Sequence, residues 1–157
     1  MILAAFIPAA WAADAPRDII ETLYSQAEAK KGGWDSPLLK SSVRGHVFSK
    51  ALLRAWNAAD ARNRKGDVGW LDFDIMSNSQ DPSVNGLRIN VAGASATSSM
   101  VAAAFRFDTD PKSEVTRVFY DFVLEDGTWK IDDIRGGTGG DQWSVRKMAQ
   151  DAVAPKR

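Results

Sequence analysis

The hydrophobic and polar positions of the chain follow two periods, and a period of two is clearest over residues 115–134. Apolar side chains alternate with polar ones in both halves of this segment, which is the pattern of a strand with one buried face. Between the halves, Asp126-Gly127 supplies the positive φ angles that a tight type I′ turn requires. The segment is therefore predicted to be a β-hairpin. One face of its first arm carries Val118, Tyr120, Phe122 and Leu124, and Trp129 and Ile131 continue the alternation in the second arm.

Further strands are expected before this hairpin. Residues 99–108 alternate in the same way, with Val101, Ala103, Phe105 and Phe107 on one face. Residues 87–96 form another expected strand, in which Gly93 predicts a bulge or bend. Residues 70–75 alternate apolar and acidic side chains, which predicts a short strand with one wet face. Pairing among these segments predicts a curved antiparallel sheet.

Other stretches follow the helical period. Residues 16–27 and 45–64 carry apolar side chains at helical spacing, with Pro16 suited to the first turn of the first helix. A last amphipathic helix is expected after Asp141, which can cap it, and the glycine run 136–140 before it is expected to be a flexible connector. This order predicts an α+β fold, with helices packed on a strongly curved, cone-like antiparallel sheet and a helix at the C-terminus.

Composition narrows the functional classes. The 157 residues suffice for one domain with a sizeable core. Lys+Arg and Asp+Glu both number 20 and no long basic run occurs, so binding of nucleic acid has no compositional support. The chain contains no cysteine, which removes disulfides, thiolate nucleophiles and thiolate metal sites.

The first residues bear on cellular location. Residues 1–12 are apolar and uncharged, and Ala10-Trp11-Ala12 fits the small-x-small pattern before a signal cleavage point. A basic n-region is missing, so we expect Met1 to lie inside a longer signal peptide; the alternative is an apolar tail that packs on the domain. Twelve residues are too few to cross a bilayer as a helix, so stable membrane insertion is not expected. The sequence predicts a signal peptide over 1–12, a single domain over 13–157 and a periplasmic or secreted protein.

A family resemblance adds to this interpretation. The hairpin motif Phe122-x-Leu124-Glu125-x-Gly127-x-Trp129-x-Ile131, after two helices and further strands, resembles the nuclear-transport-factor-2-like (cone-shaped) superfamily. More narrowly, Leu71-Asp72-Phe73-Asp74 with Gln80-Asp81, followed by residues 129–134, resembles the bacterial domain-of-unknown-function family 3828. The resemblance covers residues 16–152. It implies an exported small domain with a pocket inside the cone and no catalytic residues to transfer. By analogy with cone domains, it also suggests a homodimer formed through the sheet.

Three carboxylates form the first candidate constellation. Asp72 and Asp74 share one face of the expected short strand, and Asp81 comes from the loop that follows it. Such oxygen clusters suit hard cations such as Ca²⁺, although no glycine turn or terminal glutamate completes a calcium-loop motif. The alternatives are a ligand-facing acidic edge, or solvated and structural carboxylates with Asp81 in an Asx turn before Pro82.

Other polar motifs have weaker catalytic interpretations. Asp132 and Asp133 are adjacent and should point to opposite faces, so at most one of them can enter a pocket beside Tyr24 or Tyr120. Structural roles are favoured for both. His46 lacks the partners that a transition-metal site or a catalytic triad needs. The glycine run 136–140 lacks the Gly-Lys-Ser/Thr ending of a phosphate loop.

Aromatic residues at element ends complete the candidate site. Trp34 and Trp70 have glycine or aspartate neighbours. Partial exposure of their indoles would suit a surface that binds a ligand or partner. The alternative is that both indoles pack over the open end of the cone. The candidate ligand-binding residues are Trp34, Trp70, Asp72, Asp74, Asp81, Arg106 and Tyr120.

These features favour an exported, non-enzymatic domain without a cofactor, which binds a small ligand or an exported protein at the cone mouth. One alternative is an isomerase or dehydratase that uses a pocket carboxylate opposite Tyr24 or Tyr120. Another is an inhibitor or immunity-like domain, which would need an exposed apolar patch.

Overall fold

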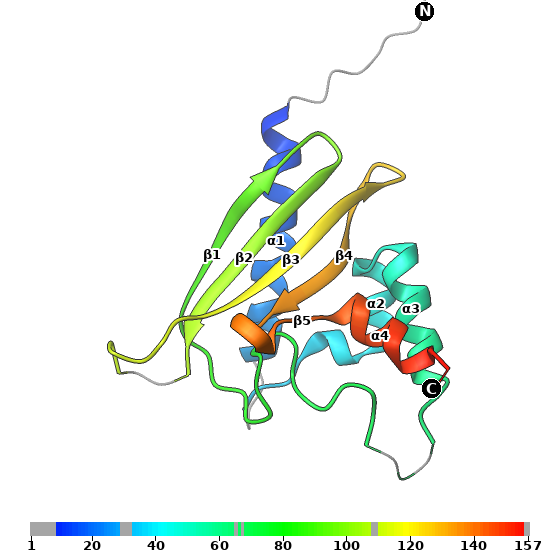
Figure 1. The fold of residues 1–157 in the computed structure, drawn as a ribbon. Coiled ribbons are helices and arrows are strands. Elements are labelled where there is room, and N and C mark those ends of the chain that lie inside the picture. Colours follow the sequence, from blue (N-terminus) through cyan, green and yellow to red (C-terminus); the bar gives the residue numbers. More distant parts are fainter. Residues whose placement is uncertain (1–8, 29–32, 65, 67, 108–109, 156–157) are drawn as a thin grey trace, which may run out of the picture.

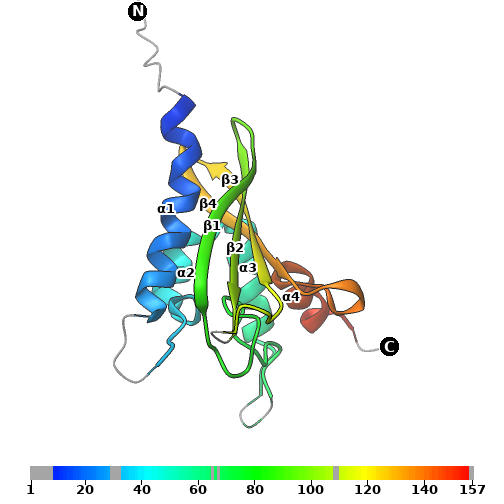
Figure 2. The same cartoon turned by 90° about the vertical axis from the view of Figure 1, so that its left-hand side faces the viewer.

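The structure is a computed structural model that describes residues 9–28, 33–64, 66, 68–107 and 110–155, with residues 9–14 described by their backbone alone. These residues form four α-helices and a five-stranded antiparallel sheet, which confirms the predicted α+β class. The sheet is open and does not close on itself. The long helix α1 lies along one face of the sheet, while α2, α3 and α4 gather beside the strand β4 (Figure 1). Figure 2 shows the twisted sheet edge-on beside α1.

The strands follow one another in space in their order along the chain. They are β1 (Asn85–Ala94), β2 (Ser98–Arg106), β3 (Thr116–Glu125), β4 (Thr128–Gly136) and the two-residue β5 (Trp143–Ser144). The predicted hairpin is confirmed as β3 and β4, and its turn residues Asp126 and Gly127 have φ angles of 50° and 75°. The irregularity expected at Gly93 is also confirmed, because the register of β1 against β2 shifts between Val91 and Gly93.

A further bulge, which the sequence pattern does not reveal, lies in β4. Asp121 pairs with Asp133 while the next residue, Phe122, pairs with Ile131, so Asp132 is an extra residue without an opposite partner. The insertion changes the alternation of the strand, and Ile131 and Ile134 are consequently both fully buried. The two neighbouring carboxylates, Asp132 and Asp133, stand at this irregular point.

The first predicted helix begins earlier than expected. Helix α1 spans Ala9–Glu28 and contains Pro16 in its interior, so the prediction that Pro16 opens the helix is wrong. Its inner face buries Ile20, Leu23, Tyr24 and Ala27. Gly33, which follows this helix in the chain, has a φ of 116°. Among the described residues, no helix combines the length and apolar character needed to cross a membrane.

The single helix predicted over 45–64 is two helices, α2 (Ser41–Val47) and α3 (Lys50–Asp60). The break has a tertiary cause, because the backbone at Phe48 and Ser49 is extended and pairs with β4. Phe48 forms a parallel bridge with Ile131, and the Ser49 amide donates to the Ile131 carbonyl at 2.8 Å. The Ser49 hydroxyl then accepts from the Leu52 amide at 3.0 Å and so caps α3.

The strand predicted over 70–75 does not form. Asp74 makes one isolated antiparallel bridge with Ser79, and the rest of this stretch consists of bends and turns. Ile75 and Met76 are nevertheless fully buried, so this segment contributes to the core without joining the sheet.

The C-terminal helix α4 spans Val145–Val153 and is capped by Ser144, whose hydroxyl accepts from the Lys147 amide at 3.1 Å. The expected cap, Asp141, lies instead in a short 3₁₀ helix, Gly139–Asp141. The glycine run is only partly a connector. A Cβ added to Gly136 would lie 2.4 Å from the Trp143 ring, and one added to Gly137 would lie 2.1 Å from the Asp141 carbonyl oxygen. Gly136 and Gly137 are therefore held in close packing.

The core lies between one face of the sheet and the helices and loop that pack against it. Its largest fully buried side chains are Tyr24, Tyr120, Phe105, Phe122, Ile20, Leu38, Leu52, Ile75, Met76, Ile131, Ile134 and Val101. Two residues that were expected on the buried face of their strands lie near strand ends and are partly exposed: Phe107 at 38% and Leu124 at 37%.

Candidate functional site

The candidate residues predicted from the sequence fall into separate places. Tyr120 and Trp34 lie on either side of Tyr24, with ring centroids 6.4 Å and 5.8 Å from that ring. Trp34 is half-buried, and its indole nitrogen is buried without a hydrogen-bond partner among the described residues. Trp70 belongs to a different cluster beside α3, and Arg106 lies on the sheet face opposite the core.

The two tyrosines form a buried hydroxyl pair. Tyr120 donates to the Tyr24 hydroxyl at 3.1 Å, and Tyr24 donates to the Met76 carbonyl at 2.6 Å. Burial raises the pKa of both phenols well above the ordinary value, and the negative charge of Asp74 adds to the rise. Tyr24 is 1% and Tyr120 0% exposed, so neither hydroxyl is open to a ligand in this conformation.

The three acidic candidates are not gathered at one point. Asp74 accepts a hydrogen bond from the Ser77 amide at 2.7 Å and thereby stabilises its own turn. Asp72 and Asp81 are exposed. In place of the expected Asx turn at Asp81, the Ser79 hydroxyl accepts from the Asp81 amide at 3.0 Å and donates to its carbonyl. Within the described part of the chain, no group of three or more His, Cys, Asp or Glu side chains is arranged to hold a metal ion.

The most organised polar constellation was not predicted from the sequence, and it surrounds Asp60 at the end of α3. The two oxygens of this carboxylate accept from the indole nitrogens of Trp70 and Trp56, at 2.8 Å and 2.9 Å. The two indoles meet edge to face, with centroids 4.9 Å apart and planes at 81°. Trp70 is thereby fixed in orientation although it is only half-buried.

A buried arginine completes this cluster. The Arg44 guanidinium lies 4.5 Å from the centroid of Trp56, donates to the Leu38 carbonyl at 2.9 Å and lies 3.7 Å from Asp60. Burial lowers the pKa of Arg44, and the negative charge of Asp60 partly opposes this shift. The i,i+4 spacing of Trp56 and Asp60 was visible in the sequence, but their contacts with Trp70 and Arg44 depend on tertiary packing.

Trp70 and Asn63 line two hollows. The larger, of about 720 Å³, also has walls from Arg62, Val68 and the end of α4. The smaller, of about 180 Å³, includes Leu39, Arg44, Trp56 and Asp60. Val68 and Leu39 are 83% and 56% exposed, which makes them the most exposed large hydrophobic side chains of the described chain. We call the two hollows and these side chains the Trp70 surface.

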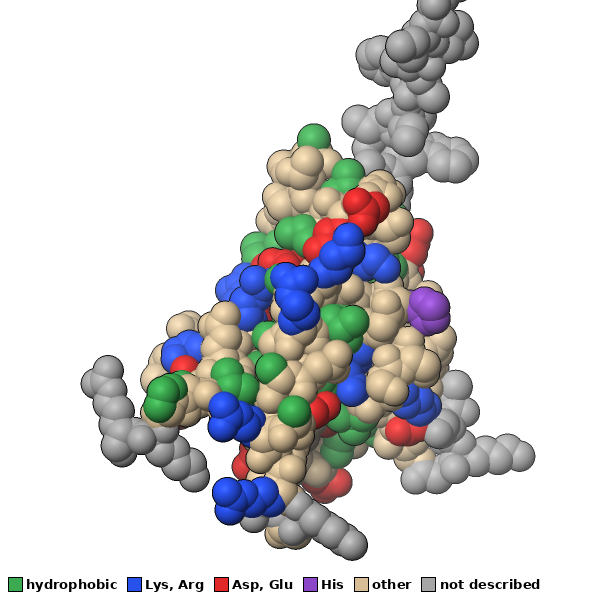
Figure 3. Space-filling model, turned by 90° about the vertical axis from the view of Figure 1, so that its right-hand side faces the viewer, with side chains coloured by type: hydrophobic (Ala, Val, Ile, Leu, Met, Phe, Trp, Pro, Cys, Tyr) green, Lys and Arg blue, Asp and Glu red, His purple; other side chains and the backbone are tan. Residues whose placement is uncertain are grey.

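The side of the molecule formed by the helical end is shown as a surface in Figure 3. Lys and Arg side chains are spread across this side, and hydrophobic side chains appear between them in small separate patches. A broad apolar face of the kind expected for an inhibitor-like domain is not visible from this direction.

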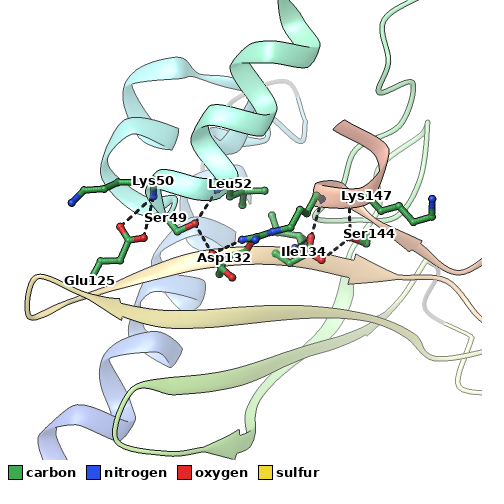
Figure 4. Close-up of polar contacts among 10 residues, drawn as sticks. Ser49, Lys50, Leu52, Glu125, Asp132, Ile134, Ser144 and Lys147 are labelled. Atoms are coloured by element: carbon green, nitrogen blue, oxygen red, sulfur yellow. Dashed lines mark hydrogen bonds and ion pairs between the residues drawn. The ribbon is translucent and has the colours of Figure 1, made fainter. Parts of the chain in front are cut away.

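Asp132 and Asp133 connect the sheet to two helices, and Figure 4 shows Asp132 on the sheet beside Ser49. Asp132 accepts from the Ser49 hydroxyl at 2.7 Å and forms an ion pair with Arg146. Asp133 accepts from the Ser144 hydroxyl at 2.6 Å and from the Arg146 amide at 3.0 Å. The carboxylates thus hold the first turns of α3 and α4 against β4, which supports their structural interpretation.

A third hollow, of about 450 Å³, lies on the sheet face that the helices leave uncovered. Arg106 lines it together with Arg88 and Arg117, and its floor includes Ala104. The cross-strand register places Arg88 opposite Ala104 and Ala104 opposite Arg117. Arg106 was a candidate from the sequence, whereas Arg88 and Arg117 were not, because the proximity of the three side chains depends on the register of three strands.

Comparison of this chain with protein-family models, with curated proteins and with solved structures finds no match to any of them.

Proposed function

We propose that this protein is an exported, non-enzymatic domain that binds a small ligand at the Trp70 surface. The observation that carries the proposal is the position of Trp70. Its indole is fixed by Asp60 and Trp56, yet it forms a wall of two hollows and remains half-buried. A fixed aromatic wall lowers the ordering cost of binding, and the larger hollow has the size of small-molecule sites.

The larger hollow beside Trp70 is lined by both apolar and polar side chains. Val68 and the alanines at the end of α4 offer apolar contact, whereas Arg62 and Asn63 offer hydrogen-bond donors. This combination suits a ligand with a flat apolar part against the indole and an acceptor group facing the arginine.

The enzymatic alternative receives less support from the geometry. It requires a carboxylate and a tyrosine that face an accessible pocket, whereas Tyr24 and Tyr120 are enclosed in the core. Asp132 and Asp133 are engaged with backbone amides, serines and Arg146. The inhibitor-like alternative would use the same Val68 and Leu39 side chains as contacts for a protein partner.

Export remains part of the proposal and rests on residues 1–12. Cleavage after Ala12 would leave intact the α1 residues that pack against the sheet, since Ile20, Leu23, Tyr24 and Ala27 all follow that point. Membership of the cone-shaped superfamily likewise remains a proposal. It is supported by the hairpin motif and by the α+β arrangement of helices on an antiparallel sheet.

A native mass spectrum of the protein purified from the periplasm tests the proposal. We expect a mature mass that begins at Ala13 and an additional bound mass that is released on denaturation. In Trp70→Ala the bound mass should be lost, because the aromatic wall of both hollows is removed.

Leu124→Ala is the matched control, since Leu124 is partly exposed at the distant end of β3 and lines neither hollow. It should retain the bound mass. A bare polypeptide in the unmodified protein, or equal retention of the ligand by Trp70→Ala, would contradict binding at this surface. Specific capture of a single protein that depends on Val68 and Leu39 would favour the inhibitor-like alternative.

A further inference from the structure

We propose that the uncovered face of the sheet holds an anion site, at which Arg88, Arg106 and Arg117 together bind one phosphate group. This site is separate from the Trp70 surface, and the two share no lining residue within the described part of the chain. The phosphate group can belong to a small soluble molecule or to a lipid headgroup.

The register of three strands creates the site. Arg88 in β1 and Arg117 in β3 flank Ala104 in β2 in one cross-strand row. Adjacent strands lie about 4.8 Å apart, so the two arginine backbones are separated by roughly 10 Å with only a methyl group between them. Arg106 lies two residues further along β2 and therefore on the same face as Ala104. Three long cationic side chains thus surround a small floor.

Among the described residues, no carboxylate forms an ion pair with the three arginines of this hollow. In the described ranges, the side chains of Arg88 and Arg117 make no hydrogen bond or ion pair, and the Arg106 side chain donates to the Ser113 carbonyl, which is uncharged. Asp121, the nearest acid along β3 on this face, is bound by Arg135 through two hydrogen bonds of 2.6 Å and 2.9 Å. Like charges on adjacent strands repel one another, and a bound anion would relieve the repulsion.

The chemistry of the hollow selects the kind of anion. Guanidinium groups present paired N–H donors that match phosphate oxygens, and several arginines around one group favour a dianion over a monoanion. The side-chain amide of Asn90 also lines the hollow and can donate to a further oxygen. The chain has no formal net charge and no long basic run, so an extended nucleic acid backbone is not the expected occupant.

Titration of the isotopically labelled protein with inorganic phosphate, at constant ionic strength maintained with chloride, tests the proposal by NMR. We expect saturable shifts of the backbone amides of Arg88, Ala104 and Arg117. Arg88→Gln and Arg117→Gln should each weaken binding about tenfold or more, as the loss of one charge-assisted contact predicts. Ala104→Leu should abolish binding by filling the floor of the site.

Arg54→Gln is the matched control. Arg54 is exposed on α3 and outside the hollow, so its replacement removes the same charge without touching the site. Shifts that do not saturate, or that fall equally in Arg54→Gln and Arg117→Gln, would overturn the proposal, because they would reflect general attraction of anions. Phosphate-independent dimerisation that Ala104→Leu abolishes would also overturn it and would identify the face as an interface between copies.

Co-sedimentation with phosphatidylglycerol vesicles separates the two sources of the phosphate group. Vesicle binding that inorganic phosphate competes away and that Arg117→Gln loses would assign a lipid headgroup. Saturable phosphate binding without vesicle binding would assign a small soluble molecule. Vesicle binding with no response to inorganic phosphate would refute a phosphate-sized site.

Discussion

The hydroxyl groups of Tyr24 and Tyr120 lie 3.1 Å apart in the core, although the two residues are 96 positions apart in the sequence. Tyr120 donates to Tyr24, and Tyr24 donates to the Met76 carbonyl at 2.6 Å. This short relay joins α1, β3 and the irregular segment before β1. The chain has only these two tyrosines, so all of its phenol groups are buried together.

This burial predicts a characteristic response to alkali. The folded-state pKa of both phenols is raised above the ordinary value of 10.0. Their contribution to stability is therefore complete below about pH 10 and decreases as the pH rises above that value, by about 1.4 kcal/mol per pH unit for each tyrosine. Tyrosinate absorbance near 295 nm should consequently appear together with the loss of far-ultraviolet circular dichroism. A phenol that ionises near pH 10 while the fold remains intact would contradict the buried pair.

Single replacements in the pair should have unequal effects. Tyr24→Phe removes the donor to Met76 and the acceptor for Tyr120, whereas Tyr120→Phe removes one donor and leaves the bond to Met76 intact. We expect the free energy of unfolding to fall by about 2–3 kcal/mol in Tyr24→Phe and by about 1 kcal/mol in Tyr120→Phe. Urea denaturation of both variants measures the difference. If both variants lose the same free energy of unfolding, the two hydroxyl groups contribute equally and the expected difference is wrong.

Asp60→Asn should loosen the Trp70 surface without unfolding the protein. A carboxamide has one acceptor oxygen, so one of the two indole nitrogens loses its partner, and Arg44 loses its nearby negative charge. Because Asp60 is 45% exposed and water can replace part of the loss, the expected cost is only about 1–2 kcal/mol.

The tryptophan emission of Asp60→Asn should shift to longer wavelength as Trp70 becomes mobile. Asp18→Asn, an exposed position on α1, is the control and should change neither stability nor emission. An unchanged spectrum in Asp60→Asn would mean that Asp60 does not hold Trp70 in place.

Two glycines of the run 136–140 should respond very differently to replacement by alanine. Alanine at Gly137 would place its Cβ 2.1 Å from the Asp141 carbonyl oxygen at a φ of 78°, whereas alanine at Gly140 meets nothing within 4 Å. We expect Gly137→Ala to cost about 2–3 kcal/mol and Gly140→Ala to change stability by less than about 0.5 kcal/mol. Thermal denaturation monitored by circular dichroism compares the two. Similar tolerance at both positions would restore the flexible-connector interpretation.

Asp133→Ala should detach the start of α4. Asp133 accepts from the Ser144 hydroxyl and from the Arg146 and Ile134 amides, so its loss leaves three donors without a partner. The expected cost is about 2–3 kcal/mol, with hydrogen exchange accelerated first in α4. Asp72→Ala removes an exposed carboxylate and should leave both measurements unchanged. Faster exchange spread evenly over the sheet would argue against a local role for Asp133.

The sequence predicts best those elements whose cause is local. The hairpin was predicted because alternation and the Asp126-Gly127 turn act within twenty residues, and the structure confirms both. The break between α2 and α3 was missed because the apolar stripe continues through it at helical spacing. Its cause is the pairing of Phe48 and Ser49 with Ile131, more than eighty residues away. Ser49 is a favourable N-cap residue and was the available signal.

The candidate site also combines features with a local cause in the sequence and features that depend on tertiary packing. Alternation over 70–75 predicted a strand, but in the structure this segment pairs with no strand of the sheet, and Trp70 bonds instead to Asp60 on α3. Trp70 was selected for its neighbours in the sequence, whereas Asp60, Arg44 and Trp56 became relevant only when the helices were placed. Arg88 and Arg117 likewise gained a role only from the register of β1, β2 and β3.

The bulge in β4 adds a side chain that reaches a helix without changing which residues of the strand face the core. With Asp132 present, Ile131 and Ile134 both face the core although three positions separate them. A chain lacking Asp132 would keep both isoleucines on the core face, because they would then be two positions apart in regular alternation, but it would lose the carboxylate that binds Ser49 and Arg146. Deleting Asp132 should therefore leave the inward-facing side chains of the sheet in place and weaken the attachment of the first turn of α3 to β4.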